Sequence, residues 1–228
     1  MDFMRLLKLI EELLYELVSW VIFYPLTLWR IVRHPMATLA YAERELGEPE
    51  EHQFDDAISP PIVLLITLGL LHVLGQAMAT ESTAVMTGVL ADDRNLLAFR
   101  AVAFSLFPLL FGLIRLKVAK ARITRSTFKP VFYSQCYATV PFVITISMGI
   151  NLLAEFAESA IDGWIGVGVL CLGFVWYVTV ESRWLAATTR TGMGRSVLTV
   201  IGTLICAVPF FFLVGAIVGY VFSEGAMS

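Results

Sequence analysis

Five runs of apolar residues, each long enough to cross a lipid bilayer, constrain this chain more than any other feature of its sequence. A transmembrane helix needs about 20 consecutive, mostly apolar residues. The five runs cover residues 60–80, 96–116, 130–154, 164–184 and 197–222. We therefore expect an all-α, polytopic integral membrane protein with five transmembrane helices.

The overall composition agrees with a membrane protein and argues against an ordinary soluble domain. Hydrophobic residues make up 58% of the chain and charged residues only 15%. Soluble domains have about 45–50% apolar and about 25% charged residues. On this basis we divide the chain into an N-terminal region (1–59), a membrane domain (60–222) and a short tail (223–228).

The positions of lysine and arginine predict which way the spans face, because short cytoplasmic loops carry an excess of these residues. A basic loop between the second and third spans holds Lys117, Lys120, Arg122, Arg125 and Lys129. Two more arginines lie between the fourth and fifth spans. The segment after the third span carries three acids and no base, and the tail has no base either. We therefore expect the N-terminus in the cytoplasm and the C-terminus outside.

Polar residues recur every three or four positions near the N-terminus, where an amphipathic helix is predicted. These residues are Asp2, Arg5, Lys8, Glu12, Glu16 and Ser19. The uncharged run that follows, 17–29, is too short for a clean span and contains Pro25. Because it carries three aromatic residues of the kind found at headgroup level, we expect it to be interfacial or re-entrant. A sixth span is less favoured, because it would place the N-terminus outside.

The segment between this helix and the first span is acidic. A short helix is predicted over 37–46, because Gly47 and Pro49 follow it and stop helices. We expect a solvated connector, since charged runs are usually solvated, and an acidic docking surface is the alternative.

No motif of enzyme chemistry occurs in the sequence. It lacks the nucleophile motif GxSxG, the zinc motif HExxH and the glycine-rich loops that bind phosphates. The histidines, His34, His52 and His72, have no spacing that would place two of them on one helix face. We therefore expect no enzymatic activity, no cofactor and no metal site, and we expect no nucleic acid among the partners.

Polar side chains inside the predicted spans are the informative ones, because they are costly in lipid and usually turn inward. His72 and Gln76 lie four residues apart, on one face of the first span. They either form a hydrogen bond between helices, which we favour, or line a path for a solute or a proton. Arg100, near the outer end of the second span, is expected to snorkel outward and to pair with Glu155 or a neighbouring acid.

Two short motifs with proline lie at the cytoplasmic ends of the first and third spans. The first is Asp56-Ala-Ile-Ser-Pro60, and the second contains Tyr137 with Pro141 four residues later. These motifs resemble those of the Yip family, which are five-span membrane proteins with a cytoplasmic N-terminal region and an outward C-terminus. The resemblance implies a non-enzymatic protein of the bacterial cytoplasmic (inner) membrane. Eukaryotic members of the family act in vesicle traffic through small GTPases and membrane shape.

We predict a Yip-like scaffold that organises lipid or protein partners at the cytoplasmic face. The basic loop is a candidate lipid contact, since each base near the surface adds about 1 kcal/mol of attraction to anionic lipid. Expected partners are membrane lipid, other membrane proteins and further copies of the chain. One alternative is a small permease or channel that uses His72, Gln76, Gln135 and Asn151. Another is an accessory subunit of a larger membrane complex.

Overall fold

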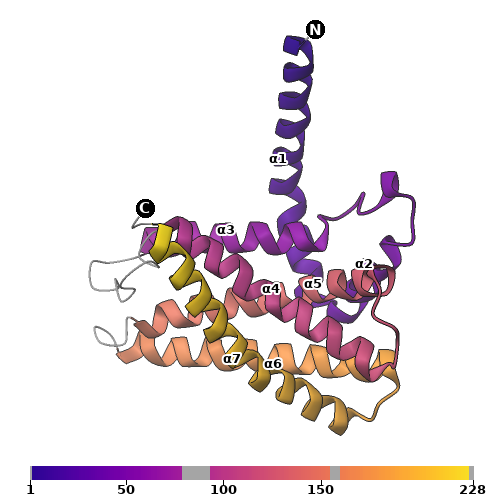
Figure 1. Cartoon of the computed structure of the whole chain (residues 1–228), viewed down its shortest axis with the longest axis vertical. Coiled ribbons are helices and arrows are strands. Elements are labelled where there is room, and N and C mark those ends of the chain that lie inside the picture. The colour runs from indigo at the N-terminus through magenta and orange to yellow at the C-terminus, as the bar shows by residue number, and fades with distance from the viewer. Residues whose placement is uncertain (1, 79–92, 155–159, 226–228) are drawn as a thin grey trace.

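The computed structural model is built of helices in the residues that it describes, which are 2–78, 93–154 and 160–225 (Figure 1). The elements are α1 (Asp2–Arg33), α2 (Pro35–Glu45), the 3-10 turn η1 (Glu50–His52), α3 (Pro60–Met78), α4 (Asp93–Val118), α5 (Arg125–Ala154), α6 (Ala160–Thr189) and α7 (Met193–Gly225). No strand occurs within these three ranges, so the all-α prediction is confirmed there.

Four of the helices are long and apolar enough to span a membrane. Their candidate spans are Leu97–Val118, Arg125–Ala154, Gly163–Thr189 and Met193–Phe211. They match the second to fifth predicted spans and indicate an integral membrane protein. The first predicted span also forms a helix, α3, but its apolar part, Pro60–Gln76, is shorter than the other four.

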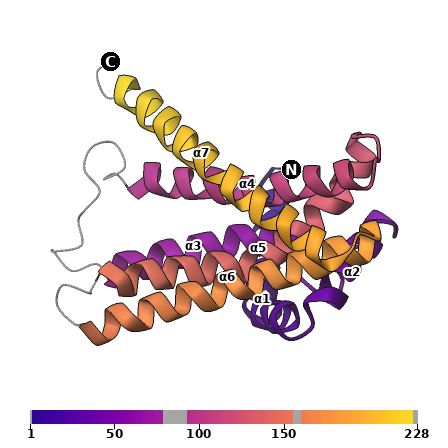
Figure 2. The same cartoon turned by 90° about the horizontal axis from the view of Figure 1, so that it is seen from below.

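Helix α5 lies at the centre of the membrane domain. It packs against α2, α3, α4 and α6, while α7 packs against α4 and α6 (Figures 1 and 2). Every residue from 134 to 143 is buried. The hydroxyls of Ser134 and Thr139 donate to the carbonyls of Val131 and Gln135 in the same helix. These two hydroxyls are therefore satisfied within α5 and do not prevent the burial of this stretch on all sides.

Aromatic rings join α4, α5 and α6. Phe142 of α5 stacks on Tyr177 of α6, with ring centroids 4.3 Å apart. Phe107 and Phe111 of α4 meet Phe142 and Tyr177 edge to face, each pair at 5.3 Å. Such pairs add about 0.5–1.5 kcal/mol each beyond the burial of their surface, so this cluster is a main contact among the three helices.

Glycines allow α5 and α6 to approach closely. A Cβ atom on Gly166 would lie 2.8 Å from the backbone nitrogen of Leu153 and 2.9 Å from the carbonyl oxygen of Gly149. A Cβ atom on Gly173 would clash with the side chain of Thr145. In lipid there is no hydrophobic drive between helices, so small residues that permit close backbone contact have a large share in their association.

Helix α1 runs in a different direction from the membrane helices. Figure 1 shows α1 upright, whereas α3 and α6 run across the view, and Figure 2 shows it nearly end-on. Residues 4–18 are exposed. The helix is continuous from Asp2 to Arg33, so the run 17–29 does not turn back, and the re-entrant interpretation is wrong. Its position at a membrane interface stays a prediction.

Helix α2 is packed on the membrane domain. Its position confirms the helix predicted over 37–46, but Thr38, Leu39 and Ala42 are buried, and the helix packs mainly against α5. The expectation of a solvated connector is therefore wrong for α2, because its apolar face, spaced by three and four residues, covers α5. Residues 47–52, which follow it, are exposed.

Gly166→Ala is expected to destabilise the membrane domain by about 1–3 kcal/mol, the usual cost of forcing extra atoms into a packed core. The added methyl group would meet two backbone atoms, which cannot rotate away. The measurement is the free energy of unfolding of the purified protein in detergent. Gly168→Ala is the matched control, because nothing lies within 4 Å of its Cβ position. An equal loss in both variants would contradict the close contact.

Candidate functional site

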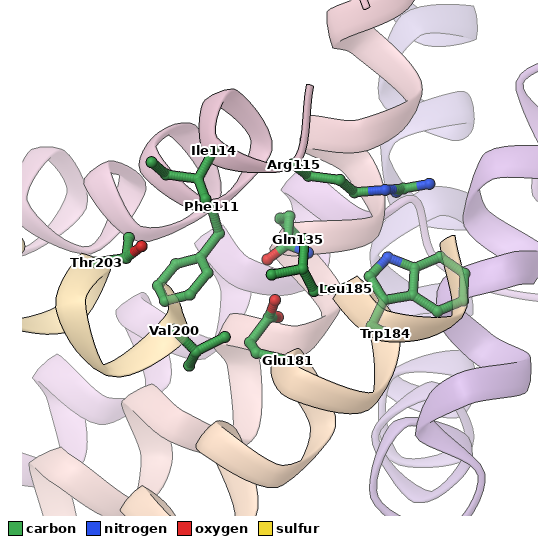
Figure 3. A pocket seen from close by; sticks show the side chains of 9 residues that line it. All are labelled: Phe111, Ile114, Arg115, Gln135, Glu181, Trp184, Leu185, Val200 and Thr203. Atoms are coloured by element: carbon green, nitrogen blue, oxygen red, sulfur yellow. The ribbon is translucent and has the colours of Figure 1, made fainter. Parts of the chain in front are cut away.

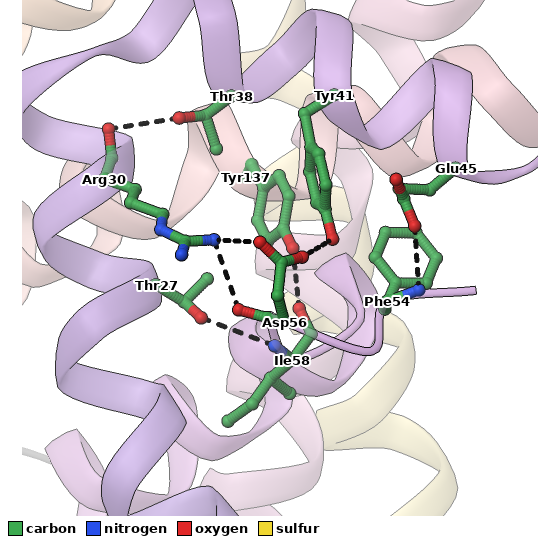
Figure 4. Close-up of polar contacts among 9 residues, drawn as sticks. All are labelled: Thr27, Arg30, Thr38, Tyr41, Glu45, Phe54, Asp56, Ile58 and Tyr137. Atoms are coloured by element: carbon green, nitrogen blue, oxygen red, sulfur yellow. Dashed lines mark hydrogen bonds and ion pairs between the residues drawn. The ribbon is translucent and has the colours of Figure 1, made fainter. Parts of the chain in front are cut away.

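Two polar clusters lie where α1 and α2 meet the membrane domain. The first, which we call the Asp56 junction, joins α1, α2 and α5 to the segment before α3 (Figure 4). Arg30 donates to Asp56 at 2.8 Å from the side-chain oxygen Oδ2 and at 3.2 Å from the backbone carbonyl. The hydroxyl of Tyr41 donates to the other carboxylate oxygen at 2.5 Å. One carboxylate therefore ties α1 and α2 to the start of the membrane domain.

These contacts keep Asp56 in its charged form. The hydrogen bond from Tyr41 lowers the pKa of Asp56 below its ordinary value of 3.8, burial opposes this, and Arg30 lowers the pKa further. The pKa of Tyr41 is raised, first by burial and then by the same hydrogen bond. Both shifts favour the carboxylate–phenol pair as it is drawn in Figure 4.

Ile58 connects the two family-like motifs through its backbone. Its carbonyl accepts a hydrogen bond of 2.6 Å from the hydroxyl of Tyr137, and its N–H donates to Thr27 at 3.3 Å (Figure 4). The structure thus brings Tyr137 of the second motif into contact with the first motif, Asp56 to Pro60. Pro60 begins α3, and Pro141 is buried one turn after Tyr137 in α5.

A pocket of about 360 Å³ lies beside the junction, between α1 and α2. Basic side chains from both helices, Arg30, His34 and Arg44, belong to its lining. Arg44 also lies over the ring of Tyr41, 6.0 Å from its centroid. The pocket therefore combines positive charge with aromatic surface.

The second cluster, the Glu181 pocket, lies among α4, α5, α6 and α7 (Figure 3). The cavity is small, about 10 Å³, and is lined by Phe111, Ile114, Arg115, Gln135, Glu181, Trp184, Leu185, Val200 and Thr203. A cavity needs about 10–15 Å³ of such volume to hold one water molecule. The pocket is therefore at the lower limit for a single water.

Arg115 links this pocket to α2. It forms an ion pair with Glu43 through both of its terminal nitrogens, one of them 3.0 Å from Oε2. Ser134 of α5 donates to the same carboxylate at 2.8 Å. The guanidinium also lies over the ring of Trp184, 5.1 Å from the centroid. Arg115 thus has an acidic partner on α2 and an aromatic neighbour on α6.

Glu181 is buried without such a partner. It is 3% exposed and Gln135 is 1% exposed, and their side chains face each other in the pocket (Figure 3). In the described part of the chain, the Oε1 atom of each is buried without a hydrogen-bond partner, and Glu181 forms no ion pair. An acid inside a membrane bundle is costly, and it marks a functional site by default.

The other residues singled out in the sequence are placed apart from this pocket. His72 is buried and Gln76 exposed, with their Nε2 atoms 3.4 Å apart in the same helix, and neither lines the Glu181 pocket. Of the four candidates for a permease path, only Gln135 lines it. Arg100 is half-buried beside Gly75, and its expected partner Glu155 lies outside the described residues.

The basic residues of the predicted lipid contact are all on the surface. Each of the five is exposed, at the end of α4, in the loop, or in the first turns of α5; they are Lys117, Lys120, Arg122, Arg125 and Lys129. In the described part of the chain none of them forms an ion pair. They are therefore free to meet anionic headgroups, and lipid contact stays a prediction.

Two acids of the clusters were not singled out from the sequence. Glu181 is the sole acid in the predicted span 164–184, and that isolation is a signal by which it could have been found. Glu43 lies 72 residues before its partner Arg115, within an acidic segment, and no local pattern marks it.

Comparison with known proteins adds no further assignment. No protein-family model, no curated protein and no solved structure matches the chain. The resemblance to the Yip family stays a prediction that depends on the two motifs alone.

Tyr137→Phe is expected to lower the free energy of unfolding by about 1–3 kcal/mol, the cost of leaving a buried acceptor without its donor. The lost bond is the one to the Ile58 carbonyl. Unfolding in detergent measures this change. Tyr133→Phe, one turn earlier in α5, is the control, since no hydrogen bond of its hydroxyl occurs among the described residues. A similar loss in both variants would show that the Ile58 bond contributes little.

Asp56→Asn is expected to lower stability at neutral pH, and the deficit should shrink as the solution is acidified. The pKa of Asp56 is lower in the folded than in the unfolded protein. The stability that it adds is therefore present above the unfolded value, near 3.8, and is lost as the pH falls through the lower folded value. The measurement is the thermal midpoint of both proteins from neutral to acid pH.

The control for this experiment is Asp55→Asn, the preceding residue, whose carboxylate is paired with the exposed His52. A deficit for Asp56→Asn that stays constant into acid, or an equal deficit for Asp55→Asn, would argue against the junction as drawn.

Proposed function

We propose that this chain is a non-enzymatic, Yip-like membrane protein that organises lipid at the cytoplasmic face of the membrane. In this proposal α3 is a fifth span, the N-terminus is cytoplasmic, the C-terminus is outside, and α1 lies in the membrane interface. The observation that carries the proposal is the direction of α1, which stands across the membrane helices (Figure 1). A helix perpendicular to the spans lies parallel to the membrane plane.

The surface of α1 supports this placement. Ile10, Leu17, Tyr24 and Ile31 are spaced by seven residues and so form one stripe along the helix. In the second half of α1 the stripe is packed: Ile31 is fully buried, and Tyr24 bonds to Thr67 of α3 at 3.0 Å. In the first half Ile10 and Leu17 are 47% and 44% exposed. The stripe is thus buried by the bundle in the second half of α1 and exposed in the first half, where lipid would cover it.

The length of α3 supports a fifth span. Its 19 residues rise about 28 Å at 1.5 Å per residue, close to the hydrocarbon thickness of about 30 Å. Five spans place the two ends of the chain on opposite sides of the membrane.

Basic groups gather at one end of the bundle. The α4–α5 loop and the α6–α7 connection lie at the same end in Figure 1, and α2 lies there as well. The pocket lined by Arg30, His34 and Arg44 is formed by α2 and the end of α1. An excess of bases is typical of the cytoplasmic side, and anionic headgroups are the partners that such groups attract.

The test is the shape of vesicles that contain the full-length protein. Ile10→Glu combined with Leu17→Glu places two charges on the apolar stripe, which should expel α1 from the interface. At equal protein content, we expect the wild-type protein to yield smaller or tubular vesicles in electron micrographs and the double variant to lose most of this effect.

The matched control adds the same two charges to the polar face, as Tyr15→Glu with Ser19→Glu. It should behave like the wild-type protein. The proposal is overturned if the wild-type protein leaves vesicle shape unchanged, or if the stripe variant reshapes vesicles as well as the wild type does.

A further inference from the structure

Whether the carboxyl group of Glu181 is charged depends on Arg115, because this residue is its candidate counter-ion. Among the described residues that line the pocket, Arg115 is the sole cation, and it is already paired with Glu43 of α2. A buried carboxylate without a counter-ion is unstable in a low-dielectric interior, and the group then takes up a proton instead. The arrangement in the structure, with Arg115 held by Glu43, is therefore the one that suits a protonated Glu181.

We propose that the Glu181 pocket is a proton-binding site, and that loss of its proton draws Arg115 away from Glu43. The proton leaves the carboxyl group for water, and the carboxylate that remains carries one negative charge. Two carboxylates, Glu43 and Glu181, then share one guanidinium. The ion pair that ties α2 to α4 becomes weaker, so the proton at Glu181 controls the docking of α2. This inference goes beyond lipid organisation and does not depend on it.

The neighbours of Glu181 suit both protonation states. The amide of Gln135 accepts a hydrogen bond through its oxygen and donates through its nitrogen, so it has a group for the acid and a group for the carboxylate. Trp184 lies one turn after Glu181 and under the guanidinium of Arg115. It therefore provides Arg115 with a favourable surface next to either acid.

Within the part of the chain that the structure describes, other ionisable groups near Glu181 are few. On its own helix Tyr177 is buried and Arg183 exposed, and on α5 the buried Cys136 follows Gln135. The α7 residues that line the pocket, Val200 and Thr203, carry no charge. Glu43 of α2 and Arg115 of α4 are then the charges that respond to ionisation of Glu181.

The first measurement is infrared spectroscopy of the full-length protein in lipid as a function of pH. We expect a carbonyl band of a protonated carboxylic acid that disappears on raising the pH and is missing in Glu181→Gln. Glu48→Gln, on the exposed loop after α2, is the control and should keep the band. A band that is absent at every pH, or that persists in Glu181→Gln, overturns the proton-binding site.

The second measurement follows α2 directly, by the distance between spin labels at Ala40→Cys in α2 and Ser126→Cys in α5. Both positions are exposed, and the three native cysteines are replaced by alanine. We expect a single short distance at low pH and a longer one that gains population as Glu181 loses its proton. Glu181→Gln, which mimics the protonated acid, should keep the short distance at high pH.

Glu43→Gln should show the longer distance at every pH, because it removes the acid that holds Arg115. The inference is overturned if the wild-type distance does not change with pH, or if Glu181→Gln changes in the same way as the wild type. Neither outcome concerns vesicle shape, so this test and that of the proposed function fail or succeed separately.

Discussion

The burial of residues 134–143 of α5 on all sides is the constraint on which the rest of this structure depends. Lipid surrounds the domain, so helices gain little from hiding apolar surface from water, and contact must come from close packing and hydrogen bonds. Helix α5 makes both kinds of contact. Gly149 lets the backbone of α6 approach closely, and Phe142 stacks on Tyr177. The hydroxyl of Tyr137 donates a hydrogen bond to the segment before α3. The neighbouring elements are therefore positioned by their packing and hydrogen-bond contacts with α5.

The two polar clusters share one arrangement. In each, an acid of the N-terminal region forms an ion pair with an arginine and accepts a hydrogen bond from a hydroxyl. Asp56 has Arg30 and Tyr41, and Glu43 has Arg115 and Ser134. The Asp56 pair is solvated and charged, whereas the Glu43 pair adjoins a pocket with a further acid. Only the second arrangement has an unequal number of acids and cations, and this is the origin of the proposed response to pH.

The helices and the candidate spans could be predicted because lipid requires long apolar runs, and these are visible in the sequence. The meeting of Tyr137 with the Asp56 motif was not predicted, although both residues had been singled out, since their contact depends on how α3 packs on α5. The solvated connector was predicted wrongly, because the acids around α2 concealed the buried face formed by Thr38, Leu39 and Ala42. Pairs such as Glu43 with Arg115 join distant parts of the chain, and a local pattern does not encode them.

The attachment of α1 has a mechanical consequence. Tyr24, Thr27 and Arg30 fix the helix to α3 and to the segment before it, at points that span seven residues, a rise of about 9 Å. The exposed part, residues 4–18, extends the helix by more than twice that length. Such a helix is a lever with a short clamped arm and a long free arm. A force on the free part is therefore transmitted through these three contacts to α3 and to the segment before it.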